Sequence, residues 1–318
     1  MERTLLSIGS INADFQMRID AHPGLHHMQQ AREFQRFPGG KAGNTAYLAA
    51  HFGLHSRLLG QVGNDDLAEQ ALAPLRRAGV DISGVSRVDG RATGVSIVMV
   101  PPDAKKYIVL ATNANDDWDE LAAKSVVDAI SNAARPACLA VDCEIPAVIV
   151  RGAVECAWEN DIPIVLDPSF PERIGHDLLA KLTAITPNVD EAEVLLGRPL
   201  DTSNKIADGL RYFCDEGVQL ACIKLAQGGC MLMSDEQVIH LPPGDVPVVD
   251  TTGAGDAFTG VLAIALLEGR EPVEAAAWAV AAANLAVKAY GSQAAYAGRE
   301  QVQSMANELL RRAQRVHG

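Results

Sequence analysis

The segment Asp250-Thr251-Thr252-Gly253-Ala254-Gly255-Asp256 follows an apolar run at residues 246–249, expected as a strand, and precedes a helical pattern at residues 257–267. Its small residues allow backbone N–H groups to converge on an anion at the start of a helix, where the helix dipole favours negative charge. Asp256 would lie beside that anion and accept a proton from an attacking hydroxyl. The segment therefore favours phosphoryl transfer over its alternative, a tight turn followed by an ordinary helix-start carboxylate.

Short apolar runs typical of buried strands recur along the rest of the chain, at residues 5–8, 57–62, 137–141, 162–166 and 220–225. Helix-period segments lie between them, and the segment that starts near Leu67 stops at Gly79, in the position of a C-terminal cap. This alternation predicts a mainly parallel sheet with helices on both faces. Residues 12–37 and 94–112 break the rhythm with extended segments, which predicts a small β-sheet lid that can exclude water from a site.

Composition narrows the class of protein. The chain has 318 residues, of which 48% are hydrophobic, and no linker or repeat divides it, so we expect one domain over residues 1–318. A formal net charge of -13 argues against a nucleic-acid or anionic-membrane partner. The first residues lack the layout of a signal peptide, and the apolar stretch 275–287 is too short to span a bilayer, so a cytoplasmic location is expected. The six cysteines form no Cys-x-x-Cys pair, which predicts free thiols.

Polar residues near two predicted element ends could form a polyol pocket. Asn12 and Asp14 alternate at a strand end, where an amide and a carboxylate can bind vicinal hydroxyls. In Gly39-Gly40-Lys41 the glycines allow the backbone to approach a ligand closely, and Lys41 and Asn44 add donors on the next turn. Taken singly, the first pair could be an Asx turn and the second group a helix start with an exposed lysine.

Asn188 and Glu191 follow a predicted strand and share one face of the next helix. Oxygen ligands of this kind suit Mg²⁺, which keeps several of its waters and contacts few protein groups directly. The sequence thus indicates indirect binding of Mg²⁺ beside nucleotide phosphates. The alternative is a helix N-cap followed by a solvated carboxylate.

Four segments, in order, resemble signatures of the ribokinase-like carbohydrate kinases, also called phosphofructokinase B type. They are Gly9-Ser10-Ile11-Asn12-Ala13-Asp14, Phe37-Pro38-Gly39-Gly40-Lys41-Ala42-Gly43-Asn44, Thr186-Pro187-Asn188-Val189-Asp190-Glu191 and the Asp250 to Asp256 segment. The resemblance covers nearly the whole chain and implies a three-layer α/β/α core with a central, mainly parallel sheet and a small β-sheet lid. It also implies an ATP-dependent, Mg²⁺-requiring kinase with D-ribose as acceptor and ribose 5-phosphate as product.

The same resemblance assigns roles to individual residues. Asp256 would be the catalytic base beside an anion loop of Gly253, Ala254 and Gly255, and the sugar would contact Asn12, Asp14, Gly40, Lys41, Asn44, Glu144 and Asp256. The nucleotide would contact Asn188, Lys224, Ala226, Gly229, Gly255 and Asn284. A monovalent cation such as K⁺ would be held at Asp250, Thr252, Ala286, Ala289, Gly291 and Ala295. Ala226 replaces a common glycine and Ala295 replaces a serine, so the sequence departs from the family pattern at both places.

Several alternatives stay open. Departures around Pro23 and Ala42 leave fructose, 2-keto-3-deoxygluconate or a nucleoside as other acceptors. A non-catalytic sugar sensor could share the fold, although the retained Asp256 and its loop argue against it. A nicotinamide-dependent oxidoreductase and a P-loop enzyme lack their glycine motifs here. An exposed lid edge would need cover, which together with the resemblance predicts a homodimer through the lid.

Overall fold

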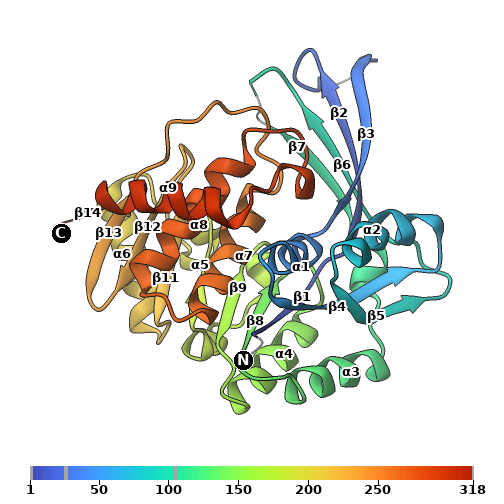
Figure 1. The fold of residues 1–318 in the computed structure, drawn as a ribbon, viewed down its shortest axis with the longest axis horizontal. Coiled ribbons are helices and arrows are strands. Elements are labelled where there is room, and N and C mark those ends of the chain that lie inside the picture. The colour runs from blue at the N-terminus through green and yellow to red at the C-terminus, as the bar shows by residue number, and fades with distance from the viewer. Residues whose placement is uncertain (1–2, 25–27, 104–105, 317–318) are drawn as a thin grey trace.

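A long, mainly parallel sheet forms the centre of the molecule (Figure 1). The computed structural model describes residues 3–24, 28–103 and 106–316. Neighbouring strands run parallel from β5 to β11, and β12, β13 and β14 extend the sheet antiparallel. In spatial order the strands are β14 (Gln314–Arg315), β13 (Gln237–Leu241), β12 (Cys230–Ser234), β11 (Leu220–Lys224), β10 (Ala184–Ile185), β9 (Ile164–Asp167), β8 (Ala137–Asp142), β1 (Thr4–Ile8), β4 (His55–Gly63) and β5 (Asp81–Val88).

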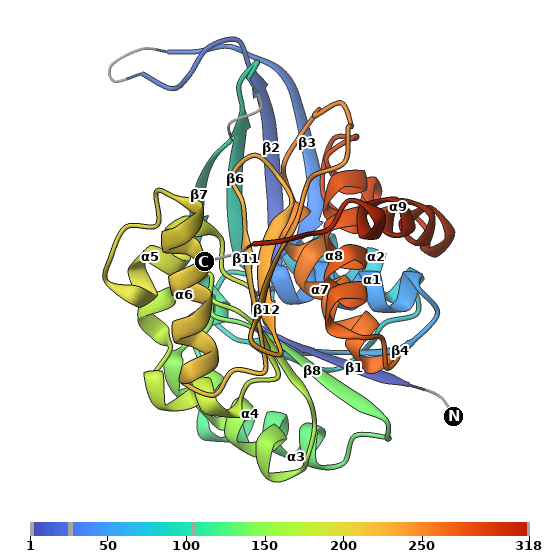
Figure 2. The same ribbon diagram turned by 90° about the vertical axis from the view of Figure 1, so that its left-hand side faces the viewer.

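Helices cover both faces of this sheet, as Figure 2 shows with the sheet seen nearly edge-on. One layer holds α3 (Glu120–Ser131), α4 (Ala147–Glu159), α5 (Val189–Leu196) and α6 (Ser203–Asp215), and the other holds α1 (Lys41–His51), α2 (Asp66–Arg77), α7 (Ala254–Leu267), α8 (Pro272–Ala286) and α9 (Arg299–Arg311). Short 3₁₀ helices span Asn113–Asp116, Pro171–Arg173, His176–Lys181 and Gln293–Ala295. Central strands such as β1 are buried along their whole length because apolar side chains pack on both faces. The predicted three-layer α/β/α core is confirmed.

A second sheet of four strands stands beside the core and rises above it in both views. Its order is β3 (Ala31–Gly39), β2 (Asn12–Ile19), β6 (Gly94–Val100) and β7 (Tyr107–Ala111), and we call this sheet the lid. Along β6, Ser96 and Val98 are buried on one face whereas Ile97 is exposed on the other. The expected smaller sheet is confirmed, and its strands lie within or next to the segments 12–37 and 94–112; residues 25–27 and 104–105 of those segments lie outside the described residues.

The chain before the anion loop differs from the expectation. Residues 246–249 form no strand, and the strand that precedes the loop is β13, which ends at Leu241. Val248 and Val249 are exposed, although the Val249 N–H donates to the Val287 carbonyl at 2.8 Å. A short valine run therefore reads like a strand but serves here as a connection.

Smaller expectations can be settled in the same way. Gly79 follows α2 with a φ of 86°, as expected of a residue just past a helix end. The six cysteines are free. Among the described residues, no helix is long and apolar enough to cross a membrane.

Candidate active site

The anion loop is shaped by Gly253, which precedes α7 with a φ of 76°. A Cβ at this position would lie 2.7 Å from the Ser292 Cβ and 2.8 Å from the Tyr296 hydroxyl oxygen, so glycine is required. Tyr296 donates to the Gly253 carbonyl at 3.1 Å. Within the described chain no side chain caps this helix. The Ala254 N–H donates to the Thr251 carbonyl at 3.4 Å, so an anion would be met by the N–H groups that follow it.

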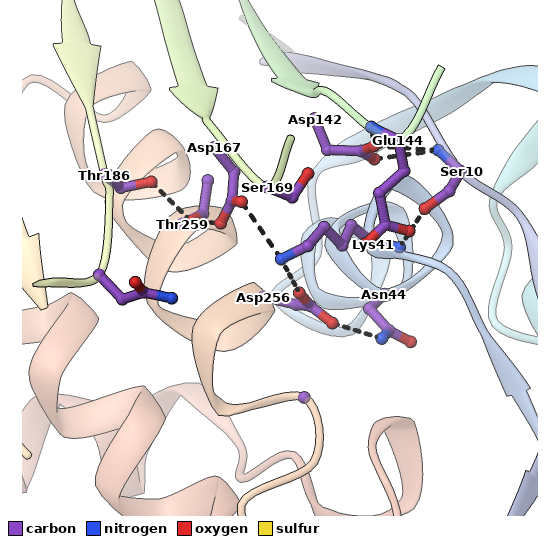
Figure 3. Close-up of polar contacts among 12 residues, drawn as sticks. Ser10, Lys41, Asn44, Asp142, Glu144, Asp167, Ser169, Thr186, Asp256 and Thr259 are labelled. Carbon is purple, nitrogen blue, oxygen red and sulfur yellow. Dashed lines mark hydrogen bonds and ion pairs between the residues drawn. The ribbon is translucent and has the colours of Figure 1, made fainter. Parts of the chain in front are cut away.

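Asp256 lies in the first turn of α7 and is held from α1 (Figure 3). Its Oδ2 accepts a hydrogen bond from Asn44 Nδ2 at 2.7 Å, and its Oδ1 lies 3.3 Å from Lys41 Nζ. Asn44 is fixed in turn by Gln293, whose Nε2 donates to its Oδ1 at 3.1 Å. The carboxylate is 12% exposed, so two helices hold it firmly while one edge stays open to a ligand.

A buried carboxylate, Asp167, anchors two lysines that line the cleft, Lys41 and Lys224. At the end of β9, Asp167 lies 3.2 Å from Lys41 Nζ and 3.0 Å from Lys224 Nζ, and it accepts from the Thr259 hydroxyl at 3.0 Å. Burial favours the neutral acid, but the two ammonium groups outweigh it and lower the pKa of Asp167 to about 2. Burial also opposes the charge on Lys41, yet Asp167 and Asp256 raise its pKa well above the ordinary value. The pocket therefore holds fixed positive charge.

The predicted sugar residues meet at the carboxyl ends of β1 and β8 and at the base of the lid. Gly40, with a φ of 86°, packs so closely that a Cβ would lie 2.4 Å from the Ser10 carbonyl oxygen. Asn12 Oδ1 accepts from Asn115 Nδ2 at 2.8 Å, which orients the amide. The Glu144 N–H donates to Asp142 at 2.9 Å, and that buried carboxylate also accepts from the Ser10 N–H.

Asp14 is a buried carboxyl group of this sugar pocket whose pKa is shifted. It is 7% exposed and accepts a hydrogen bond from the Ser96 hydroxyl. Burial raises its pKa to about 7; the Ser96 bond opposes that shift, and the negative charges of Asp256 and Glu144 add to it. Asp14 therefore changes charge near neutral pH.

One cleft of about 1030 Å³ joins the sugar and nucleotide sides. Its lining includes every residue predicted for catalysis and for sugar contact, and every residue predicted for nucleotide contact: Asn12, Asp14, Gly40, Lys41, Asn44, Glu144, Asn188, Lys224, Ala226, Gly229, Gly253, Ala254, Gly255, Asp256 and Asn284. The inner face of the lid closes one side with Ser96, Val98, Ile108 and Leu110. Residues spread over most of the sequence are thus brought together at one edge of the sheet.

The nucleotide side of the cleft lies at the ends of β10 and β11. A parallel bridge pairs Asn188 with Lys224 and sets these two strand ends side by side. Asn284, on α8, is 7% exposed, and its Nδ2 has no hydrogen-bond partner among the residues described. A buried amide donor that lines a cleft without a partner suits a polar ligand atom such as an adenine nitrogen.

The predicted Mg²⁺ residues form a capping box. Asn188 Oδ1 accepts from the Glu191 N–H at 2.8 Å, and Glu191 Oε2 accepts from the Asn188 N–H at 2.8 Å. The alternative reading of Asn188 as a helix N-cap is confirmed, and the same residue lines the cleft; its role towards Mg²⁺ stays a prediction. Among the described residues, no group of three or more His, Cys, Asp or Glu is placed to hold a metal. The capping box uses Glu191 Oε2 and does not use Oε1. A single carboxylate oxygen of this kind suits a water ligand of a hydrated Mg²⁺ that arrives with the nucleotide.

The residues predicted for a monovalent cation do not fit one bound directly by Asp250. This carboxylate is fully buried and accepts from the Thr252 N–H at 2.9 Å and the Thr252 hydroxyl at 2.7 Å. It also accepts from the Gly291 N–H at 3.0 Å and from Gln16 Nε2 at 2.5 Å. A carboxylate offers about four lone-pair positions, and all are used. The other predicted residues, Ala286, Ala289 and Ala295, lie outside the lining of the cleft.

Sequence reasoning missed five residues that the structure brings to the site: Gln16, Ser96, Lys106, Asn115 and Asp167. Asp167 directly follows the predicted strand at residues 162–166, so the rule that ligands gather at the carboxyl ends of strands could have found it. Lys106 donates to the Thr251 carbonyl at 3.1 Å from the lid. Burial lowers its pKa, although Asp256 and Asp250 oppose that shift. No sequence signal marks a lid lysine that reaches the anion loop.

Comparison with known proteins agrees with this geometry. The family model of pfkB family carbohydrate kinases matches residues 2–297. The ribokinase of Haemophilus influenzae is 28% identical over 301 residues, covering 95% of this chain and 97% of that protein. A deoxyribokinase of Salmonella typhi is 27% identical over 295 residues, covering 92% of this chain and 95% of that protein.

Among solved structures, Arabidopsis thaliana ribokinase complexed with ribose and ATP superposes with a TM-score of 0.81. It is 27% identical in sequence, and the match covers 96% of this chain and 99% of that one. The family match spans nearly the whole chain, and the superposition extends over the core and the lid. This chain belongs to the pfkB family of carbohydrate kinases, and it is therefore a phosphotransferase that acts on a sugar hydroxyl.

Proposed function

We propose that this chain transfers the γ-phosphoryl group of ATP to D-ribose and produces ribose 5-phosphate. The observation that carries the proposal is the position of Asp256, which lies in the first turn of α7 beside the glycine loop and faces the cleft. Its two partners, Lys41 and Asn44, come from α1, the helix that opens after Gly40 in the sugar pocket. The ribokinase relatives and the ribose and ATP complex support ribose as the acceptor.

The chemistry follows from these contacts. The sugar hydroxyl approaches Asp256, which accepts its proton as the new O–P bond forms and the bond to ADP breaks. The N–H groups at the start of α7 bind the oxygens of the transferring phosphoryl group. Lys41 and Lys224, fixed by Asp167, add positive charge beside it. A Mg²⁺ held through water by Asn188 and Glu191 would neutralise charge on the phosphates.

The remaining predictions belong to the same proposal. We infer a single kinase domain over residues 1–318, a cytoplasmic location, and a homodimer formed through the lid. Support for the dimer comes from apolar side chains on the outer face of the lid, where Phe34, Ile97 and Val109 are each more than one third exposed. Such a surface favours a protein partner.

The test is ADP release with Mg²⁺-ATP and D-ribose, 2-deoxyribose, fructose, 2-keto-3-deoxygluconate, adenosine or inosine, with the product's phosphate located by ³¹P NMR. The highest kcat/KM for ribose, with the phosphate on O5, supports the proposal. A higher value for another acceptor replaces ribose but keeps the mechanism. Sugar binding without turnover on any of them would instead favour a sensor.

A further inference from the structure

The contact between Gln16 and Asp250 joins the lid to the loop that binds the transferring phosphate. Gln16 lies on β2 and is 1% exposed, and its Nε2 donates to Asp250 Oδ2 at 2.5 Å. The other oxygen of Asp250 accepts from the N–H and the hydroxyl of Thr252, the residue before Gly253. Asp250 therefore fixes the start of the anion loop, and Gln16 fills the position on its carboxylate that a bound cation would need.

A second lid residue brings positive charge to the same segment. Lys106, next to β7, donates from Nζ to the Thr251 carbonyl at 3.1 Å, one residue from Asp250. A bound monovalent cation would do the same two things: contact the carboxylate and neutralise charge at backbone carbonyls. Here an amide and an ammonium group do both, and both are carried by the lid.

Further contacts attach the lid to the loop that follows α8, which packs beneath the same site. The Arg18 guanidinium lies 4.3 Å over the Tyr290 ring. The Phe37 ring meets Tyr290 edge-on at 5.9 Å, and Gly291 leaves so little room that a Cβ would lie 3.0 Å from Phe37. The N–H of Gly291 also donates to Asp250. Lid strands β2 and β3 thus cover the region where the family resemblance places a cation.

We propose that Gln16 and Lys106 take the place of a monovalent cation, so that the lid braces the anion loop and catalysis needs no K⁺. The inference rests on the proposed function for its activity readout alone. Because both donors belong to the lid, the order of the loop depends on the lid lying against the core. The family's cation site is then a lid contact in this chain.

The first experiment uses the unaltered enzyme. Initial rates with ribose and Mg²⁺-ATP are measured in chloride salts of tetramethylammonium, Na⁺ and K⁺ at one ionic strength, and Tm is measured in the same buffers. We expect rates that agree within about twofold and no K⁺-specific rise in Tm, because a cation that binds only the folded state would raise Tm. A K⁺-specific rate increase of more than about twofold, or a K⁺-specific rise in Tm, overturns the proposal. If no acceptor is phosphorylated, the proposed function fails, and the Tm comparison still decides this inference.

The second experiment removes the amide. Gln16→Met keeps the volume but leaves Asp250 Oδ2 without its donor, so kcat should fall by about tenfold, the usual scale for a buried, charged hydrogen bond. The variant should also gain a rise in Tm with K⁺, since an oxygen of Asp250 becomes free. The matched control is Gln35→Met, opposite Gln16 on β3, where the amide donates to Glu33 of the same strand. Unchanged kcat in a folded Gln16→Met protein contradicts the assignment, and if this variant does not fold, the cation series decides.

The ammonium group is tested separately. Lys106→Met should lower kcat by about tenfold, whereas Lys106→Arg, which retains a positive donor, should restore most of it. Ribose KM should change less than kcat in both variants, since Thr251 belongs to the anion loop. Equal losses in the two variants would show that shape rather than charge matters at this position and would remove Lys106 from the proposal.

Discussion

The two walls of the cleft hold their polar groups in different ways. Behind the core wall, Asp167 and Asp250 are buried carboxylates whose partners come from several elements, and the pKa of Asp167 is lowered to about 2. On the lid wall, Asp14 has a raised pKa, and the lid's outer face is apolar and exposed. We infer that the core supplies the fixed charges that phosphoryl transfer needs. The lid recognises the acceptor on its inner face and a second subunit on its outer face.

Removing the base should give the largest effect, on the core wall. Asp256→Asn keeps the shape and can still bond to Asn44, but it cannot accept the proton of the attacking hydroxyl. We expect kcat to fall by about 10²-fold or more, the usual scale for loss of a general base, while ribose binding measured by calorimetry persists. Asp190→Asn, at an exposed carboxylate in the first turn of α5, is the control. Near-normal turnover of Asp256→Asn would remove the catalytic assignment.

Neutralising Asp167 tests how far the charge on the core wall depends on burial. Asp167→Asn leaves Lys41 and Lys224 without their shared carboxylate, and removing one partner of a buried ion pair costs about 3 kcal/mol in the free energy of unfolding. The folded pKa of about 2 lies below the ordinary 3.8, so this stabilisation is complete above 3.8 and is lost as the pH falls towards 2. Urea denaturation of the unaltered enzyme and of Asp167→Asn measures this loss in the free energy of unfolding. We expect the loss to be smaller at pH 3 than at pH 7.

An exposed ion pair is the control for that experiment. Asp201→Asn removes the partner of Lys205, which lies 2.9 Å away on the surface. We expect a change below about 0.5 kcal/mol, because solvent screens such pairs. Equal losses at the two positions would mean that the buried network adds nothing beyond an ordinary surface contact.

Much of the core could be predicted from the sequence because its strands are buried on both faces and read as apolar runs. The run at residues 137–141 became β8 almost unchanged. The prediction of a strand at 246–249 was wrong because a valine-rich connection carries the same local signal. Its backbone is held by Val287, just after α8, rather than by a neighbouring strand. Contact partners of this kind are invisible in a single sequence.

The site divides in the same way. Asp256 and Gly253 were predictable because their chemistry needs a glycine loop at a helix start, which is a local pattern. Gln16 and Lys106 were not predictable, because each contacts a residue more than one hundred positions away in the sequence. The lid segments themselves carry only a partly alternating sequence pattern. Local motifs thus revealed residues on both walls, Asp14 among them, whereas contacts between segments far apart in the sequence required coordinates.

Titration of Asp14 should produce a smaller effect, on the lid wall. Its pKa of about 7 leaves it mostly neutral at pH 6 and mostly charged at pH 8, with Asp256, Glu144 and Lys106 as its charged neighbours. The carboxylate form accepts from sugar hydroxyls at both oxygens, so ribose KM should fall about tenfold from pH 6 to pH 8. The folded pKa of Asp14 lies above its ordinary 3.8, so its contribution to the free energy of unfolding is complete below 3.8 and is lost as the pH rises towards 7.

The variant Asp14→Asn separates this titration from others in the cleft. We expect weaker ribose binding at every pH and a flat KM profile, because the amide does not titrate in this range. The kcat profile, which reports groups in the enzyme–substrate complex, provides an independent check. A KM that keeps its slope in Asp14→Asn would transfer the titration to another group, such as Glu144, whose pKa is also raised by burial.

Charging the outer face of the lid should affect assembly more than chemistry. Val109 is 59% exposed and pairs across the sheet with Ile97, so Val109→Asp places a carboxylate inside the proposed dimer contact. Light scattering at micromolar concentration should then report a monomer, with kcat within about twofold of the unaltered enzyme, since a surface substitution away from the cleft has little effect on stability. Leu121→Asp, on the exposed face of α3, is the control and should leave the dimer intact. A monomer formed by the unaltered chain would contradict the proposed dimer. The contrast between the two walls would then no longer include a role for the lid in assembly.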